Sequence, residues 1–431
     1  MIAISVVDIM DIFIRENGSS GISQDDIASA LLRSLEGREL HRVLIVPPDF
    51  TRFHSNAGFI TNTYYHTLTE RGVDVDILPA LGTHVPMTHE ECAEMYGDIP
   101  FERFLVHNWR ADVINIGEVP ADFLTEITDG LWNDPVSVEI NRLIMDPAYD
   151  LIISVGQVVP HEVIGMANHS KNLFVGCGGS DMINKSHMVG AVYGMERMMG
   201  KDHTPVRRVF DYALEHFLAE RPVLYVLTVT TAPGGVIHTH GLFIGEKRNT
   251  LEAAIELSQK ININFVDCGI RKCVVYLDPR EFHSTWLGNK AVYRTRMAIA
   301  DGGELIVLAP GVDKFGEDPA NDALIRKYGY CGRLKVLELF KTHTDLQENM
   351  GTAAHLIHGS SDGRFSVTYA VKAISQAEIE SVGFIPADYD EMAARYCPDT
   401  LSYGWNTLPD GEEIFFIPNP ALGLWIDSTR F

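Results

Sequence analysis

Three features are scarce in this chain of 431 residues, and each scarcity excludes a class of protein. No apolar run approaches the roughly 20 residues that cross a bilayer, so we expect no membrane partner. The 35 Lys and Arg are outnumbered by 58 Asp and Glu, and the formal net charge of −23 argues against nucleic acid, which needs clustered cations. The six cysteines lack Cys-x-x-Cys spacing, which favours reduced thiols in a cytoplasmic protein.

The apolar start of the chain does not resemble a secretion signal. Residues 1–16 carry Asp8 and Asp11 and no basic leader. The length instead allows two domains with hydrophobic cores of their own. No oligomeric state follows from the sequence.

Strand-length apolar runs alternate with amphipathic stretches along the whole chain, which is typical of an α/β protein with largely parallel sheets. Two helices are predicted, over residues 23–35 and 58–70. Strands are predicted near residues 43–46, 73–81, 111–116, 151–156, 222–230, 272–277 and 304–309. We expect two α/β domains, residues 1–262 and 263–431, with an active-site crevice between them. The last ~20 residues could return to the first domain.

Polar side chains follow three of the predicted strands. Asp49 and Arg52 lie in the loop after the first strand, and His84 follows the second. His161 follows the strand 151–156. Because parallel strands end along one edge of a sheet, we expect these side chains to converge. Taken singly, His84 would be an ordinary loop residue, and Asp49 and Arg52 a turn cap and a surface cation. Together they indicate a ligand site in which Arg52 offers a donor fork to a carboxylate or phosphate.

The densest polar chemistry lies between His161 and His187. These two residues and Lys171 are separated by spacings of 10 and 16, which match no common zinc signature. Each alone favours a structural role. A nearby glycine turn reverses that interpretation, since successive backbone amides can hold a phosphate. Its members are Gly176, Gly178 and Gly179.

Two other clusters allow alternatives. His238 and His240 share a strand face and could bind zinc or iron in a hydrolase or lyase, although a structural pair is favoured. Arg294 and Arg296, after Tyr293, are either an anion site or a solvated basic face.

In order and spacing, these residues resemble the lactate racemase (LarA-like) family, which uses a nickel-pincer nucleotide. The resemblance covers roughly residues 40–190. It rests on a sequence of short motifs: Asp49-x-Thr51-Arg52, Gly82-x-His84, Pro160-His161, Lys171 and His187.

The resemblance implies roles for individual residues. Residues 1–262 would be the cofactor-binding catalytic domain. Lys171 would tether pyridinium-3,5-bisthiocarboxylic acid mononucleotide through a thioamide, and His187 would bind nickel, for which imidazole is a suitable ligand. His84 and His161 would be the paired acid/bases. The loop residues that would help position cofactor or substrate are Asp49 and Arg52.

The implied chemistry is inversion of the carbinol carbon of a 2-hydroxy acid by reversible hydride transfer. Each enantiomer presents its hydroxyl group differently, so two bases are needed. Histidine, with an ordinary pKa near 6.5, can accept or donate a proton near neutral pH. The small-molecule substrate would be held by Arg52, Tyr293 and Arg294.

Two departures from the family pattern matter. The usual Ser-Gly-Gly-Arg-Lys is replaced by residues 167–171, Ala-Asn-His-Ser-Lys, which predicts a stiffer loop with His169 as an extra polar group near the site. After Tyr293, Arg294 and Met297 stand where the lactate enzymes carry Gln and Lys. We therefore expect a larger 2-hydroxy acid or a sugar acid rather than lactate. The alternatives are a zinc or iron hydrolase or lyase, and a non-catalytic cofactor-binding relative.

Overall fold

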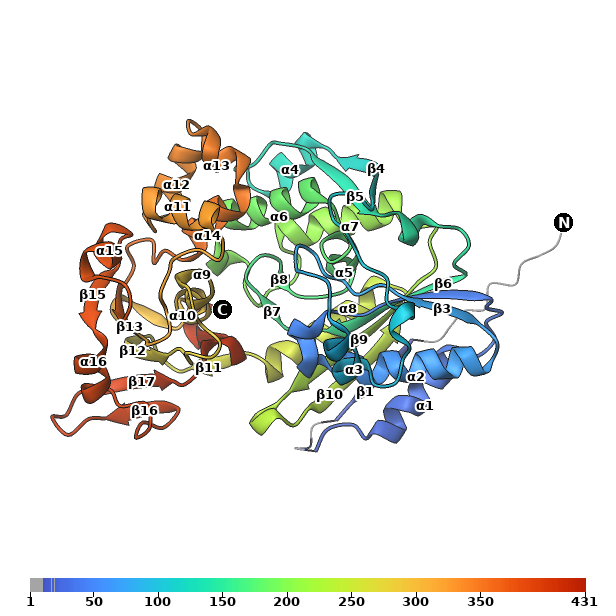
Figure 1. Cartoon of the computed structure of the whole chain (residues 1–431), viewed down its shortest axis with the longest axis horizontal. Coiled ribbons are helices and arrows are strands. Elements are labelled where there is room, and N and C mark those ends of the chain that lie inside the picture. The colour runs from blue at the N-terminus through green and yellow to red at the C-terminus, as the bar shows by residue number, and fades with distance from the viewer. Residues whose placement is uncertain (1–10, 17, 19) are drawn as a thin grey trace. The chain divides into compact units, whose positions relative to one another are not determined.

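The computed structural model describes residues 11–16, 18 and 20–431 (Figure 1). Residues 1–10 of the apolar start lie outside this part. Within the described residues, no helix is long and apolar enough to cross a membrane. All six cysteines are free thiols.

Packing divides the chain into two units. The first runs to Ser186 and resumes over Gly200–Asn262, and the second comprises His187–Met199 and Ile263–Phe431. The sequence predicted a single boundary after residue 262, whereas residues 187–199 also group with the second unit. Each unit contains a largely parallel sheet with helices, as the alternating pattern predicted.

The sheet of the first unit has six strands in the order β1-β10-β9-β6-β2-β3. The four strands β3, β2, β6 and β9 run parallel, whereas β10 is antiparallel to β9 and β1 to β10. The strand bounds are β1 (Ile12–Arg15), β2 (Arg42–Val46), β3 (Asp74–Ile77), β6 (Leu151–Gln157), β9 (Val223–Thr231) and β10 (His238–Gly245).

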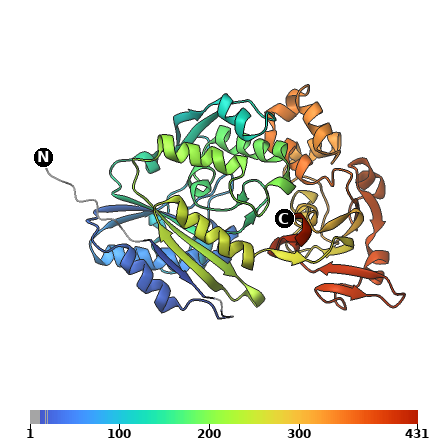
Figure 2. The ribbon, with the colours of Figure 1, turned by 180° about the vertical axis from the view of Figure 1, so that it is seen from behind.

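Helices cover both faces of this sheet. Figure 2 shows α8 lying along β9 and β10, against which it packs. The helices of the first unit are α1 (Gln24–Ser34), α2 (Ala57–Glu70), α3 (His89–Tyr96), α4 (Ala121–Ile127), α5 (Ser170–Phe174), α7 (Pro205–Phe217) and α8 (Arg248–Ile261). Helix α6 (Ser180–Tyr193) begins in the first unit and ends in the second.

Local signals set most of these bounds. Helix α1 begins after Ser23, whose hydroxyl accepts a hydrogen bond from the Asp26 amide at 3.1 Å. Strand β3 is shorter than predicted, because Pro79 has no amide to donate to the ladder. The strand predicted near 111–116 is β4 (Val113–Val119), but it pairs antiparallel with β5 (Val136–Asn141) outside the main sheet.

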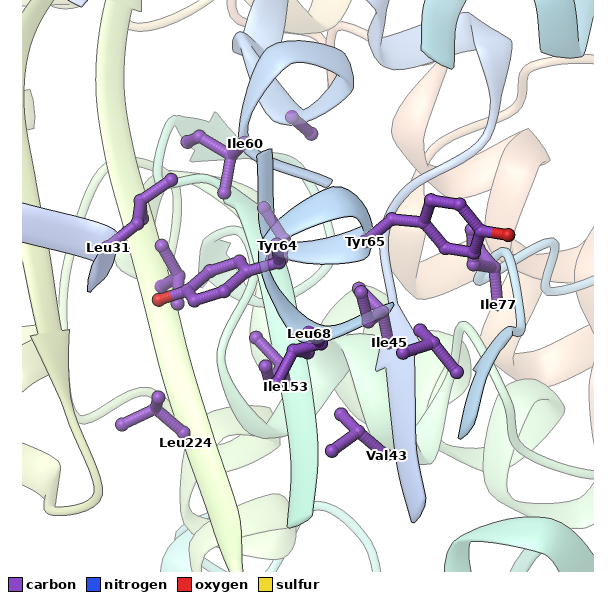
Figure 3. Packing of buried hydrophobic residues seen from close by; sticks show 14 of the residues in the cluster. Leu31, Val43, Ile45, Ile60, Tyr64, Tyr65, Leu68, Ile77, Ile153 and Leu224 are labelled. Atoms are coloured by element: carbon purple, nitrogen blue, oxygen red, sulfur yellow. The ribbon is translucent and has the colours of Figure 1, made fainter. Parts of the chain in front are cut away.

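Alternate residues of β2, β6 and β9 build the core against α1 and α2 (Figure 3). Val43 and Ile45 point to this face because successive side chains of a strand alternate. Tyr64 brings a hydroxyl into the same core and pairs it with Ser34 Oγ at 2.8 Å. The opposite face of the sheet is thereby left for α5, α7 and α8, and it carries the polar chemistry described below.

The second unit has its own six-stranded sheet, in the order β15-β14-β13-β12-β17-β16, parallel except for the β16–β17 pair. The strands are β12 (Ile270–Tyr276), β13 (Ile299–Ala309), β14 (Ser366–Val371), β15 (Ile385–Asp388), β16 (Gly404–Thr407) and β17 (Glu413–Ile417). Near the C-terminus, β18 (Trp425–Asp427) pairs with β11 (Asn264–Val266), so the last residues join the second unit and do not return to the first.

Eight helices of this unit lie wholly after β11 in the sequence. They are α9 (Thr285–Gly288), α10 (Lys290–Thr295), α11 (Pro319–Tyr328), α12 (Arg333–Phe340), α13 (Thr344–Glu348), α14 (Met350–His358), α15 (Gln376–Ser381) and α16 (Tyr389–Arg395).

The core of the first unit predicts a large cost for truncating Leu68, which is fully buried on α2. We expect Leu68→Ala to lower the free energy of unfolding by about 2–4 kcal/mol, since it removes buried methyl groups and leaves a cavity. Leu334→Ala is the matched control, because Leu334 is 72% exposed on α12; its effect should stay within about 0.5 kcal/mol. Urea unfolding measures both, and equal effects would contradict the assignment of this core.

Candidate active site

The loops that leave β6, β2 and β3 are neighbours, because these strands are adjacent and parallel. Asp49, His161 and His84 follow the carboxyl ends of β2, β6 and β3, as the sequence pattern predicted. A direct contact joins two of the loops: Nδ1 of His84 lies 2.5 Å from Oδ2 of Asp49. Residues 35 positions apart therefore meet at one edge of the sheet.

Asp49 is a buried carboxylate that orients His84. It is 6% exposed, and the Thr51 hydroxyl donates to its Oδ1 at 2.5 Å. Burial alone would raise the pKa of Asp49, but hydrogen bonds from His84 and Thr51 and the charge of Arg52 hold that pKa below its ordinary value. Asp49 is thus an anion that accepts the Nδ1 proton of His84. The Nε2 lone pair of His84 is then available as a base on a side chain that is 58% exposed.

His161 has a different arrangement. It is 7% exposed in the short strand β7 (Pro160–His161), and its Nδ1 accepts the backbone amide of Val163 at 3.1 Å. The proton of the neutral ring therefore sits on Nε2, which makes His161 a donor where His84 is an acceptor. A carboxylate oxygen of Glu162 lies 4.0 Å from the same Nδ1. Glu162 can accept a proton from Nδ1 when the ring is charged.

Lys171 lies in the first turn of α5, close enough to these loops to feel their charges. Burial lowers its pKa to about 8; the positive charges of Arg52 and Arg207 add to that effect, and Glu162 and Asp49 oppose it. Among the described residues, no hydrogen-bond partner of the amine is found. Two of the residues that the sequence predicted to converge, Asp49 and Arg52, thus act on one amine, a fraction of which is uncharged near neutral pH.

Helix α5 is pinned to the sheet by an amide that the sequence motifs did not include. Nδ2 of Asn172 donates to Val46 O at 2.9 Å and to Ser154 Oγ at 3.1 Å, so it ties α5 to β2 and β6. Nothing in the local pattern marks Asn172, because both acceptors lie on distant strands. Glu162 was also missed, although it follows His161, and Thr51 was part of a motif but had been given no role.

The loop before α5 is strained. Asn168 and His169 have φ of +69° and +59°, a region that costs non-glycine residues roughly 1–2 kcal/mol each. Nδ2 of Asn168 also occupies the space beside Gly156, where a Cβ would approach it to 2.0 Å. His169, predicted as a polar group near the site, is instead fully buried and stacked on Tyr225 at 3.7 Å between ring centroids. Burial of the His169 ring helps to fix the loop, although this ring is not a polar group of the site.

The glycine turn serves packing. The amides of residues 176–179, which are the three glycines and Cys177, donate to the carbonyls of Lys171, Leu173, Val175 and Glu139. A Cβ on Gly176, Gly178 or Gly179 would lie 2.4, 1.8 or 2.3 Å from its nearest neighbour. These glycines are needed because neighbouring protein atoms approach the backbone closely. Their amides donate within the protein, so we do not assign them as phosphate contacts.

Three further candidates belong to the second unit. His187 is half-buried on α6, at the start of the segment grouped with that unit, and Tyr293 and Arg294 are buried on α10. Arg296 has a structural role, since its guanidinium pairs with Glu196 at 2.6 Å and Asp362 at 3.0 Å. It is neither the anion site nor the solvated face considered above.

The alternative metal pair is not assembled. His240 Nε2 contacts Thr231 Oγ1 at 2.8 Å, and His238 Nδ1 contacts Ser20 O at 3.3 Å. In the part of the chain that the structure describes, the His, Cys and carboxylate groups close enough to share an ion are Asp202, His203 and Glu252, a largely exposed set without His238 or His240.

Comparison with known proteins finds a family match for part of the chain. Residues 24–199 match the family model of the lactate racemase N-terminal domain. This part of the chain is similar to that domain. This confirms the resemblance found in the sequence motifs. A search of curated proteins finds no match.

Two solved structures share the fold over nearly the whole length. A Thermotoga maritima protein aligns with a TM-score of 0.78 and 23% identity, covering 96% of this chain and 99% of its own. The lactate racemase apoprotein from Thermoanaerobacterium thermosaccharolyticum aligns with a TM-score of 0.70 and 16% identity, covering 94% and 93%. The lactate-racemase fold therefore extends beyond residue 199 into the second unit.

Burial of Lys171 predicts that this residue costs stability. Because its folded pKa of about 8 lies below the ordinary 10.5, the unfolded chain binds the proton more tightly. Lys171→Met should therefore raise the free energy of unfolding by about 1–3 kcal/mol at pH 7, and the gain should fade between about pH 8 and 10.5.

Lys272→Met is the matched control. Lys272 pairs with Glu412 and Glu304, which raise its pKa, so its removal should destabilise the protein at pH 7. Chemical unfolding at several pH values measures both variants. A loss of stability in Lys171→Met at pH 7 would contradict a desolvated amine with a lowered pKa.

Proposed function

We propose that this protein is a racemase or epimerase that inverts the carbinol carbon of a 2-hydroxy acid with a nickel-pincer nucleotide. The observation that carries the proposal is the convergence of the Asp49–His84 pair, Arg52 and Glu162 on the amine of Lys171. The similarity of residues 24–199 to the lactate racemase N-terminal domain supports the same chemistry.

The residues present suit this cofactor. An uncharged amine is a nucleophile, so Lys171 is chemically able to carry the covalent attachment. His187 is the candidate nickel ligand, because imidazole is a suitable ligand for nickel. When bound, the nickel-pincer nucleotide supplies a hydride acceptor. Arg52 and Asp49 would help hold cofactor or substrate beside it.

The two histidines handle the proton of the substrate hydroxyl. His84 accepts this proton at Nε2, because Asp49 accepts a hydrogen bond from Nδ1–H and, as an anion, stabilises the resulting cation. To return a proton from Nε2, His161 must itself be charged, with both ring nitrogens protonated, and Glu162, whose carboxylate lies 4.0 Å from Nδ1, would stabilise that charge. For the opposite enantiomer these roles exchange.

Arg294 and Tyr293 are the candidates for substrate recognition in the second unit. A buried guanidinium can bind a carboxylate through two parallel hydrogen bonds. Met297, which is 2% exposed, adds no charge one helical turn further on. We therefore propose a substrate larger than lactate, either a longer 2-hydroxy acid or a sugar acid.

Protein purified from a host that makes the cofactor should contain about one nickel per chain. Mass spectrometry of its peptides should find a cofactor-derived mass on Lys171, and Lys171→Met should lose both the mass and the nickel. An active enzyme with an unmodified Lys171 would refute the tether.

The metal assignment has a matched pair of variants. His187→Ala should lose nickel, whereas His238→Ala should keep it, because His238 contacts the Ser20 carbonyl and belongs to no predicted nickel site. The reverse result would favour the zinc or iron hydrolase or lyase. Elemental analysis of both proteins after the same purification decides between them.

The acid/base assignment predicts that His84→Gln, His161→Gln and Asp49→Asn lower turnover while nickel is retained. We expect losses of about 10²–10⁴-fold for either histidine. Optical rotation of pure enantiomers in D₂O, across a panel of hydroxy acids and sugar acids, measures the activity. Loaded wild-type protein that inverts no member of the panel would favour a non-catalytic cofactor-binding relative.

A further inference from the structure

Arg207 is almost completely buried in the first turn of α7, at 1% exposed. Its guanidinium donates to the loop before Lys171 at three points: to Met166 O at 2.7 Å, Asn168 O at 3.2 Å and Ser170 Oγ at 2.9 Å. A single side chain therefore holds the whole segment 166–170 from one side.

All three acceptors are neutral, which is unusual for a buried cation. Arg248, which lies within electrostatic range of Arg207, shows the ordinary solution: it pairs with Asp202 at 2.5 Å and Asp211 at 3.2 Å. Burial lowers the pKa of Arg207 to about 10, yet the group stays charged near neutral pH. The charge of Arg207 is thus less compensated by direct contacts than that of Arg248. It therefore influences the pKa values of nearby ionisable groups.

The held loop cannot maintain its shape alone. Asn168 and His169 both occupy the left-handed region, and neither is glycine. The carbonyl of Asn168 and the hydroxyl of Ser170, on either side of His169, are two of the acceptors of Arg207. The guanidinium of Arg207 therefore holds the strained backbone on both sides of His169.

We propose that Arg207 is a positioning residue for Lys171: it fixes the loop that presents the lysine, and its permanent charge disfavours the charged form of the lysine amine. The first half follows from the three hydrogen bonds. The second follows because two buried cations within electrostatic range disfavour each other, and a guanidinium retains its proton more strongly than an amine. The other charges that act on Lys171 are Arg52, Glu162 and Asp49.

This inference deepens the proposed function, in which Lys171 carries the cofactor, but its test needs no cofactor. Cofactor-free full-length protein is pulsed with acetic anhydride, which acylates only the uncharged amine, at pH values from 6 to 11. Peptide mass spectrometry then gives the midpoint of Lys171 acylation. Amide hydrogen exchange of residues 166–170 is measured on the same proteins.

Two variants separate charge from geometry. Arg207→Met removes the charge, and we expect the acylation midpoint to rise by about one pH unit with faster exchange of the loop. Arg207→Lys keeps a charge but loses the planar fork, so the midpoint should stay within about 0.3 units while loop exchange still accelerates. If Arg207→Met does not fold, Arg207→Lys still tests the hold on the loop.

Arg221 supplies the matched control. It also donates only to backbone carbonyls, those of Ile144, Asp146 and Tyr149, at the opposite end of the parallel strands. Arg221→Met should change neither the midpoint of Lys171 nor the exchange of residues 166–170. Unchanged readouts in both Arg207 variants, with only a lower Tm, would overturn the inference. A Lys171 that never carries cofactor mass but depends on Arg207 would overturn the proposed function alone.

Discussion

The candidate site depends on lowering the pKa of one amine that protein atoms surround. Burial disfavours the charged form of Lys171, and Arg52 and Arg207 add positive charge around it. Two carboxylates pull in the other direction: Asp49, which is hydrogen-bonded to His84, and Glu162, which lies 4.0 Å from Nδ1 of His161. The same set of charges therefore serves two purposes. It leaves Lys171 able to react, and it gives each histidine a carboxylate that can stabilise its charged form.

The fold makes this convergence possible because the two faces of the first sheet, and the edge at the carboxyl ends of its parallel strands, have different roles. One face, with Val43 and Ile45, is largely apolar and packs on α1 and α2. The other face receives α5, α7 and α8 and tolerates polar groups such as Ser154, because Asn172 satisfies them. The loops at the carboxyl ends of the strands supply the side chains of the candidate site. Rigidity comes from the apolar face, and the placement of Lys171 comes from hydrogen bonds on the polar one.

The sequence predicted those parts of the molecule that depend on local pattern. Helices α1 and α2 and strands β2 and β6 follow from periodicity, and the meeting of Asp49 with His84 follows from strand order. The hairpin β4–β5 did not, since the partner of a strand is a non-local choice. Arg207 and Asn172 lie outside every motif because their acceptors are distant in sequence. The glycine turn shows a different limit: glycine permits both exposed amides and close packing, and only coordinates distinguish them.

The opposite proton positions on the two histidines carry a kinetic consequence. His84 rests as the acceptor and His161 as the donor, so one enantiomer meets a base that is ready and the other must wait for the proton on His161 to move. Enantiomers of a simple hydroxy acid have equal free energies, which forces kcat/KM to be equal for both directions. The asymmetry must then appear as unequal kcat and unequal KM that compensate each other. Replacing Glu162 by Gln should widen the difference, because it removes the acceptor for the Nδ1 proton of His161. Separate measurement of kcat and KM for each enantiomer tests this, and identical values in both directions would mean that the two rings exchange protons faster than turnover.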